Sequence, residues 1–207
     1  MIFPALYNGP INYYARLVKQ QVIVLEQYDS YSKQTYRNRC MIMGANGVIA
    51  LSIPVKKERG KKNHLRDIRI DYDTSWNKMH WRSLVASYAT SPFFEYIADE
   101  IFPFYEKNYD FLIDLNYQLL EYTLEFLGLN TELKYSEVFT PISSEQDPRH
   151  FIHPKKNQAV VDPGFLPLDY HQVFSDRLGF RANLSILDLI FNEGPNALTY
   201  LHRCLRT

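Results

Sequence analysis

Cysteine is scarce in this sequence, with only Cys40 and Cys204 among its 207 residues. These two residues lie far apart and belong to no CxxC-type cluster, so the sequence predicts neither a disulfide framework nor a structural zinc site. We therefore expect reduced thiols, with Cys40 packed as a small hydrophobic residue.

Long apolar runs are also missing. The apolar opening of the chain is interrupted by Pro4, Asn8 and Pro10, and no run approaches the roughly 20 residues that span a bilayer. The N-terminus does not resemble a signal peptide. We therefore expect a cytoplasmic protein without membrane insertion.

Neither sign of charge dominates the sequence. The 23 Lys and Arg residues balance the 23 Asp and Glu residues, which gives a formal net charge of zero and a pI near 7.0. This balance argues against binding to nucleic acid or anionic membranes through overall charge. Any basic site must therefore be a local group of Lys and Arg residues. The sequence does not indicate the oligomeric state.

Several familiar functional signatures are absent. The sequence contains no GxxxxGK(S/T) phosphate loop, no GxGxxG and no HExxH. His150 and His153 could ligate a metal only if further ligands came from elsewhere. The sequence therefore predicts no metal site, and it leaves the cofactor unknown.

Apolar and aromatic residues are plentiful, at 46% and 15% of the chain. A chain of this length and composition buries a sizeable core, and we expect one α/β domain over residues 1–207. Residues 1–6 predict a strand, and the Asn8-Gly9-Pro10 turn places proline near the start of a helix. Apolar residues then follow helical spacing as far as Val18, and residues 22–25 predict a buried strand. This order predicts a βαβ unit with parallel strands.

The rest of the chain predicts a hairpin followed by helices. Residues 36–43 and 48–55 flank a Gly-Ala-Asn-Gly turn, and we expect the hairpin to join the βαβ unit in one mixed sheet. A third, half-exposed strand is expected at residues 68–72. Middle and C-terminal helices should cover the sheet. Ser91-Pro92 is expected to supply the N-cap and N1 residues of one helix, and a longer helix over residues 110–127 should end at Gly128. A capping box from Ser185 to Asp188 should start a further helix, and Pro195 should open the last one. A short strand is expected at residues 159–161.

The polar segment before the hairpin is the first candidate site. Lys33, Arg37 and Arg39 could grip a phosphate or carboxylate, with Asn38 beside them. Arg37 and Arg39 share one face of an extended strand while Asn38 and Cys40 share the other, so the four cannot all converge unless the strand bends. The alternative is an exposed edge whose arginines pair with acidic neighbours.

Two further groups follow the hairpin. Residues 56–66 hold six basic residues and one acidic residue, and they could close over a phosphorylated substrate or form an ordinary solvated loop. Lys56 and Lys57 are the better candidates, whereas we expect Lys61 and Lys62 to serve solubility. Trp76 and His80 lie four residues apart on one helical face, with Trp81 next in sequence. The histidine could be a general base or a packed structural residue.

The sequence resembles the WbqC-like family from its Phe3-Pro4-Ala5-Leu6-Tyr7-Asn8-Gly9-Pro10 opening, through the hairpin, Trp76, His80 and Tyr88, to Asn183-Leu184-Ser185-Ile186-Leu187-Asp188. The resemblance covers nearly the whole chain. It implies a transferase of bacterial surface-polysaccharide synthesis, of the O-antigen type, for which a role as a glycine transferase has been proposed. The transferred group would be an aminoacyl or acyl group and the acceptor a sugar.

A division of labour follows for the candidate residues. Tyr7, Asn8 and Asn12 would line the substrate entrance, with a phosphate near the helix N-terminus at Asn12 and Tyr13. The anionic group would be held by Lys33, Arg37 and Arg39, and the remaining substrate contacts are Tyr31, Asn38 and Lys56. His80 or Asp29 would accept the proton of the attacking amine or hydroxyl. The expected partner is an anionic small molecule, either a nucleotide-sugar or an activated acyl or aminoacyl donor. The alternative function is that of a binding protein, which would recognise a nucleotide-sugar or a partner enzyme without turnover.

Overall fold

The computed structural model describes residues 1–56, 63–142, 144, 147–152 and 162–206. Its strands are β1 (Ile2–Pro4), β2 (Val22–Glu26), β3 (Arg39–Gly44), β4 (Gly47–Ser52), β5 (Val55–Lys56), β6 (Arg69–Ile70) and β7 (Glu132–Tyr135). The α-helices are α1 (Ile11–Leu17), α2 (Trp76–Tyr88), α3 (Phe94–Ile101), α4 (Pro103–Glu106), α5 (Leu112–Phe126), α6 (Ser175–Leu178), α7 (Ile186–Glu193) and α8 (Ala197–Arg203). Three 3₁₀ turns complete the list, η1 (Leu65–Asp67), η2 (Pro148–His150) and η3 (Gly194–Asn196). The α/β class is thus confirmed.

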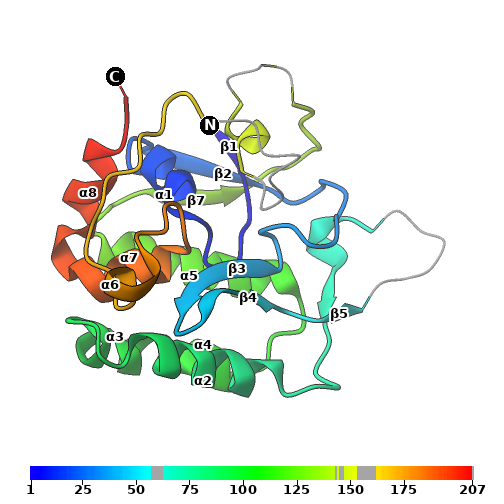
Figure 1. Cartoon of the computed structure of the whole chain (residues 1–207). Coiled ribbons are helices and arrows are strands. Elements are labelled where there is room, and N and C mark those ends of the chain that lie inside the picture. Colours follow the sequence, from blue (N-terminus) through cyan, green and yellow to red (C-terminus); the bar gives the residue numbers. More distant parts are fainter. Residues whose placement is uncertain (57–62, 143, 145–146, 153–161, 207) are drawn as a thin grey trace.

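A parallel sheet in the order β1-β2-β7 contains the βαβ unit (Figure 1). Ile2 pairs with Val24, and α1 crosses over between β1 and β2, as the sequence predicts. The side chains of Ile23 and Leu25 are fully buried, which explains the continuous apolar run of β2. The parallel arrangement of β1 and β2 is therefore confirmed.

The third strand of this sheet, β7, was not expected from the sequence. Val22 of β2 pairs with Glu132 of β7, and the pairing continues to Leu25 and Tyr135. Only Leu133 of β7 is even half-buried, and Glu132 and Lys134 are exposed. A charged edge strand of this kind lacks the apolar pattern by which strands are recognised, because its side chains face water.

The hairpin does not join the parallel sheet, which corrects the expectation of one mixed sheet. Among the described strands, β3 and β4 pair only with each other, and β5 and β6 form a further two-stranded sheet. The outer edge of β3 is occupied, because Met43 N–H donates to the Tyr88 hydroxyl and Ser185 N–H donates to the Met41 carbonyl. These contacts use the backbone groups that a further strand would need.

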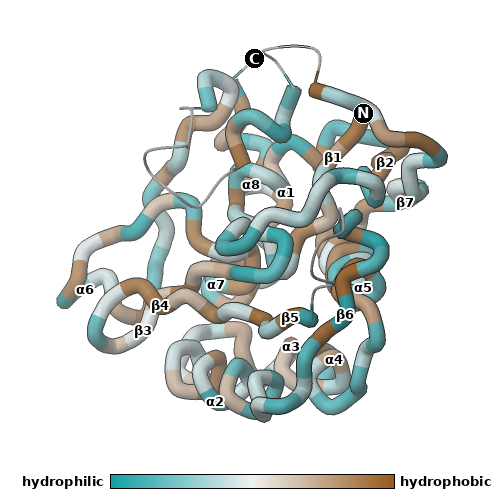
Figure 2. The backbone as a smooth tube through the Cα atoms, turned by 90° about the vertical axis from the view of Figure 1, so that its right-hand side faces the viewer, coloured by the Kyte–Doolittle hydropathy of each residue, from teal (hydrophilic) through white to brown (hydrophobic). Residues whose placement is uncertain are grey.

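The elements are layered from the sheet to the middle helices. Figure 1 and Figure 2, which are related by a turn about the vertical axis, both place the parallel sheet at the top and α2, α3 and α4 at the bottom. The hairpin and α5 lie between these layers. α2 packs on β3, and α7 contacts both β3 and α1.

Some expected helix ends are confirmed and others are wrong. Gly128 follows α5 with a φ of 71°, as expected of a glycine after a helix. Ser91-Pro92 is not the start of α3, because the Ser91 hydroxyl donates back to the Tyr88 carbonyl after α2 and Phe93 occupies the N-cap of α3. Ser185 does cap α7 by accepting from Leu187 N–H, but Asp188 completes no capping box since its carboxylate binds other side chains.

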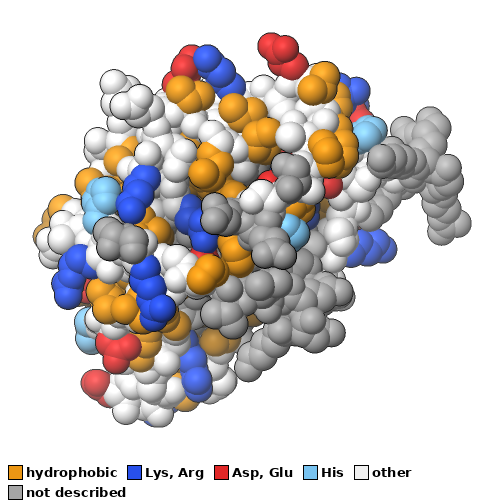
Figure 3. All heavy atoms as spheres, turned by 90° about the horizontal axis from the view of Figure 1, so that it is seen from above, with side chains coloured by type: hydrophobic (Ala, Val, Ile, Leu, Met, Phe, Trp, Pro, Cys, Tyr) orange, Lys and Arg blue, Asp and Glu red, His pale blue; other side chains and the backbone are white. Residues whose placement is uncertain are grey.

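Charges of both signs are interspersed with hydrophobic side chains on the face shown in Figure 3. None of the helices in the described part of the chain is long and apolar enough to cross a membrane. The expected strand at residues 159–161, together with Lys57, Lys61, Lys62 and His153, lies outside the described residues.

Candidate functional site

The carboxyl end of β1 leads into a buried group of hydrogen-bonded rings. The Tyr7 hydroxyl lies 2.9 Å from His80 Nδ1 and 3.3 Å from the Tyr105 hydroxyl, to which Asn8 Nδ2 also donates at 3.3 Å. All four side chains are buried. Residues from the end of β1, from α2 and from α4 therefore meet at one point, as parallel-sheet ligand sites commonly require.

His80 is held neutral in this group. Burial lowers its pKa from 6.5 to about 4, against a hydrogen bond to the backbone of Ser52 that raises the pKa. A neutral imidazole has one donor nitrogen and one acceptor nitrogen. One of these two nitrogens, Nδ1, is hydrogen-bonded to the Tyr7 hydroxyl. The imidazole is therefore a buried, neutral partner of Tyr7.

Four buried polar atoms on the chain after β1, on the segment before β3 and on α5 have no partner among the described residues. They are Asn8 Oδ1, Arg37 Nε, Asn38 Oδ1 and Asn116 Oδ1, and we call these four residues the carboxyl-edge cluster.

The segments that carry the cluster are hydrogen-bonded to one another. Asn116 Nδ2 donates to the Arg37 carbonyl at 2.8 Å and to the Ala5 carbonyl at 3.3 Å. Tyr7 N–H donates to the Tyr36 carbonyl at 3.0 Å. The cluster therefore joins the end of β1, the segment before β3 and α5.

The expected anion-binding arginines already have protein partners. Arg37 forms an ion pair with Asp29, which is the alternative that the sequence left open. Arg39 Nε donates to the Ser52 hydroxyl at 2.9 Å. Burial raises the pKa of Tyr31 to about 12, and the nearby guanidinium groups of Arg37 and Arg39 lower it by less than burial raises it.

The lysines lie apart from this group. Lys33 is exposed on the loop before β3. Lys56 is also exposed and forms ion pairs with Asp71 and Asp73, 3.4 and 3.3 Å away. Its charge is therefore balanced by neighbours on the segment that follows β6.

The N-terminus of α1 is filled by the protein itself, which corrects the expected phosphate site there. Ile11 N–H donates to the Leu184 carbonyl, and Asn12 N–H donates to Asn183 Oδ1 at 2.8 Å. Tyr13 N–H donates to the Pro10 carbonyl. With these donors engaged, an anion has no free backbone N–H groups to bind. The Asn12 side chain is buried, and its Oδ1 has no partner in the described part of the chain.

The expected group of Trp76, His80 and Trp81 divides in two. Trp76 is buried against His80, with ring centroids 5.1 Å apart. Trp81 instead contacts Phe102 and Tyr105 from the region of α4.

A carboxylate at the end of β2 was also missed from the sequence. Glu26 is buried, and it accepts from Tyr28 N–H, the Ser136 hydroxyl and Thr140 N–H at 2.8 to 2.9 Å. Both of its carboxylate oxygens therefore accept hydrogen bonds, and the bonds from Ser136 and Thr140 hold the chain after β7 against the sheet. We therefore assign it a structural role.

Tyr105 and Asn116 are the two site residues that the sequence did not indicate. Each is one polar residue in an otherwise ordinary helical pattern, and its partners lie between 79 and 111 residues away in sequence. No group of three or more His, Cys, Asp or Glu residues suited to a metal ion occurs in the part of the chain that the structure describes.

Comparisons with known proteins agree with the sequence resemblance. A profile of the WbqC-like protein family matches residues 6–200. The chain is also similar to the uncharacterized protein Rv1507c of Mycobacterium tuberculosis, with 29% identity over 199 aligned positions that cover 84% of each chain. No solved structure matches the chain.

Proposed function

Because the chain belongs to the WbqC-like protein family, we propose that it is a transferase of bacterial surface-polysaccharide synthesis that binds an activated, anionic donor at the carboxyl-edge cluster. The family resemblance supports the biosynthetic setting. The donor would be an activated acyl or aminoacyl compound, a glycyl donor among them, and the acceptor would be a sugar, for example the sugar of a nucleotide-sugar. The observation that carries the proposal is the set of four buried, unpartnered polar atoms on segments hydrogen-bonded to one another.

Unpartnered buried polar atoms favour a ligand because they are costly in an empty protein. Leaving one buried donor or acceptor unsatisfied costs about 1–3 kcal/mol. The cluster presents three amide oxygens, which accept hydrogen bonds, and Arg37 Nε, which donates one. A ligand with hydroxyl or amine groups and an anionic group offers partners to both kinds of atom.

The transfer step needs a proton acceptor beside the bound donor. A donor R–CO–X would react with a sugar hydroxyl or amine, H–Y–sugar, to give R–CO–Y–sugar and HX. The new bond forms between the carbonyl carbon and Y, and the bond from that carbon to X breaks. Asp29 would accept the proton from Y and return it to X, because its carboxylate lies against Arg37.

The remaining candidate residues have supporting roles in this proposal. Arg37 would bind the anionic group, with Arg39 and Tyr31 beside it, and Lys33 would add an outer charge. His80 would position Tyr7 rather than act as the base, since burial lowers its pKa to about 4 and its Nδ1 is hydrogen-bonded to the Tyr7 hydroxyl.

A ligand screen followed by a turnover assay tests the proposal. Nucleotide-sugars, acyl-CoA compounds and nucleotides would be screened by thermal shift, because a ligand at 100 times its Kd stabilises by about 2.7 kcal/mol. The best donor would then be incubated with amino- and hydroxy-sugars, and the acylated sugar sought by mass spectrometry. We expect the wild-type protein to give product and the Asp29→Asn variant to bind the donor but give at least about 100-fold less product.

The same experiment identifies the second candidate function. A binding protein would be stabilised by a nucleotide-sugar and give no product with any acceptor. That candidate is favoured by one observation, which is that His80, one of the two expected proton acceptors, is buried and has its pKa lowered to about 4 by that burial. Absence of stabilisation by every compound would contradict both functions.

A further inference from the structure

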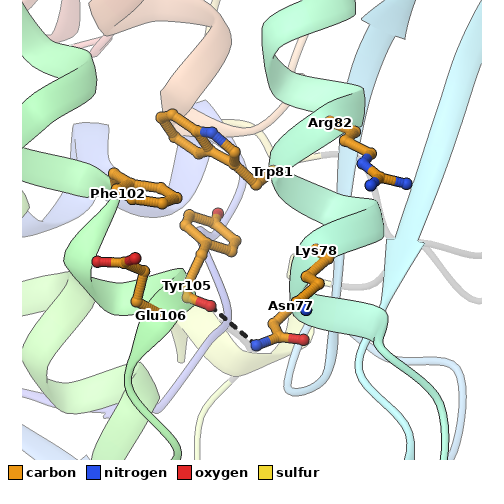
Figure 4. Close-up of a pocket in the computed structure, with 7 residues that line it drawn as sticks. All are labelled: Asn77, Lys78, Trp81, Arg82, Phe102, Tyr105 and Glu106. Atoms are coloured by element: carbon orange, nitrogen blue, oxygen red, sulfur yellow. Dashed lines mark hydrogen bonds between the residues drawn. The ribbon is translucent and has the colours of Figure 1, made fainter.

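A second site lies on the opposite side of Tyr105 from the carboxyl-edge cluster. Here the surface is hollowed by a pocket of about 340 Å³ between α2 and α4 (Figure 4). The pocket is lined by Asn77, Lys78, Trp81, Arg82, Phe102, Tyr105 and Glu106. Its volume lies within the range of small-molecule sites, although at the lower end.

We propose that this pocket binds the ring of an acidic saccharide, meaning a sugar that carries a carboxylate or a phosphate group. Its three chemical elements are an aromatic wall, a cation and a carboxylate. The proposal does not depend on the transfer reaction, because none of the groups assigned to that reaction lines the pocket.

Trp81 provides the aromatic wall. Its ring centroid lies 4.9 Å from that of Phe102 and 5.7 Å from that of Tyr105, and Figure 4 shows the three rings grouped together. Phe94 stacks on Trp81 at 6.1 Å, so the indole is held between α3 and α4 yet remains partly exposed. A fixed and partly exposed aromatic ring can contact the apolar face of a sugar ring.

Lys78 and Glu106 supply the polar contacts from opposite sides of the pocket (Figure 4). Both side chains are exposed, and neither takes part in an ion pair with another described residue. Lys78 would bind the anionic group of the saccharide, and Glu106 would accept hydrogen bonds from its hydroxyl groups. Arg82 lies one helical turn after Lys78, with its guanidinium pointing away from the rings in Figure 4, and would add a second, longer-range cation.

Tyr105 connects this pocket to the buried site. Asn77 Nδ2 donates to its carbonyl at 2.9 Å on the pocket side, while its hydroxyl contacts Tyr7 and Asn8. A saccharide in the pocket would therefore lie one side chain away from the carboxyl-edge cluster.

Isothermal titration calorimetry with four probes tests the proposal. The probes are glucuronate, glucose 6-phosphate, glucose and inorganic phosphate. We expect glucuronate or glucose 6-phosphate to bind about tenfold more tightly than glucose, because only these sugars offer an anion to Lys78. The comparison between the two acidic sugars identifies which anionic group the pocket prefers.

Three variants locate the binding. Lys78→Gln should lower the affinity for the acidic sugar about tenfold, to the level of glucose, and Trp81→Leu should abolish detectable binding of every sugar. Lys19→Gln removes another exposed lysine, which does not line this pocket, and should leave the affinity unchanged. Because Trp81 also packs on other rings, its variant needs a melting curve, whereas Lys78 is exposed and its replacement should leave the fold intact.

Three results would overturn the proposal. The first is equal affinity for the acidic sugar in the wild type and in Lys78→Gln. The second is inorganic phosphate binding as tightly as glucose 6-phosphate, which would indicate an anion site without ring recognition. The third is no heat of binding with either acidic sugar at millimolar concentration.

Discussion

At the scale of single residues, Arg37 carries the clearest prediction for binding. Its guanidinium combines an ion pair to Asp29 with a buried Nε that lacks a partner among the described residues. Arg37→Ala should weaken the binding of an anionic donor by about 1.5–3 kcal/mol, the range for a hydrogen bond to a charged group. Calorimetry with the donor found by the thermal-shift screen measures the change.

The matched control is Arg177→Ala, which removes an exposed arginine of α6. Its affinity for the donor should equal that of the wild type. If Arg37→Ala also binds normally while staying folded, the anionic group is held elsewhere.

His80 gives a pH-dependent prediction for stability. Its pKa falls from 6.5 to about 4 on folding, mainly through burial. Between about pH 6.5 and pH 4, His80 is therefore protonated in the unfolded chain but neutral in the folded chain. The contribution of His80 to the free energy of unfolding is fully present above pH 6.5 and is lost as the pH falls from about 6.5 to about 4. The contribution is on the order of 3 kcal/mol, since one pKa unit corresponds to about 1.4 kcal/mol.

Urea unfolding of the wild type and of His80→Gln at several pH values isolates this contribution from other titrating groups. The difference in unfolding free energy between the two proteins should change between pH 7 and pH 4. A constant difference would mean that the imidazole is not held neutral by the fold.

The catalytic role of His80 is a separate prediction. A residue that only positions Tyr7 should leave turnover per folded molecule nearly unchanged in His80→Ala, with a lower melting temperature. A general base would instead lower turnover about 10²- to 10⁴-fold. Turnover and melting temperature measured on the same preparation distinguish the two roles. The burial of His80 and its hydrogen bond to Tyr7 lead us to expect the first.

At the scale of elements, the hairpin depends on the backbone of one glycine. Gly47 follows the turn between β3 and β4 with a φ of 124°, beyond the left-handed region that asparagine or aspartate can occupy. A methyl group there would meet no atom within 4 Å, so its cost comes from the backbone alone. Gly47→Ala should lower the free energy of unfolding by about 1–3 kcal/mol.

Gly128→Ala is the matched control for this prediction. Its φ of 71° lies near the left-handed helical region, and a Cβ there also meets open space. Its replacement should cost only about 1 kcal/mol in urea unfolding. A larger loss at Gly128 than at Gly47 would contradict the argument from φ.

The elements that could be predicted from the sequence are those whose local pattern agrees with their burial. β2 is apolar and lies in the centre of the parallel sheet, and Pro10 directly precedes α1. The βαβ unit could therefore be predicted from the sequence. β7 was missed because an edge strand with Glu132 and Lys134 exposed has no apolar pattern. The separate hairpin was missed because its outer edge is occupied by Tyr88 and Ser185, which are distant in sequence.

The candidate site shows the same limit. Tyr7, Asn8 and His80 could be named from the sequence, but their hydrogen bonds could not. Tyr7 bonds to His80, which is 73 residues away in the sequence, and Asn8 bonds to the hydroxyl of Tyr105, which is 97 residues away. Residues such as Asn116 gain their importance from a backbone carbonyl on another element, which leaves no local signal.

At the scale of the whole molecule, Asp188 links the C-terminal part of the chain to the middle. Its buried carboxylate accepts from the Tyr88 hydroxyl, from Gln172 Nε2 and from the Tyr170 hydroxyl. Tyr88 in turn accepts from Met43 N–H of β3. One side chain thus joins α7, α2, the hairpin and the segment before α6.

Removal of one donor to this carboxylate should destabilise the entire molecule. Tyr170→Phe deletes only a hydroxyl and should lower the free energy of unfolding by about 1.5–3 kcal/mol, because a buried carboxylate loses a charge-assisted hydrogen bond. Tyr122→Phe, which deletes an exposed hydrogen bond to Glu100, should cost less than about 1 kcal/mol.

Urea unfolding followed by tryptophan fluorescence and by circular dichroism should give coincident curves for Tyr170→Phe, since Asp188 joins elements from distant parts of the chain. Separate transitions would mean that the C-terminal part unfolds independently, and equal losses in the two variants would show that burial of the carboxylate adds nothing to the bond.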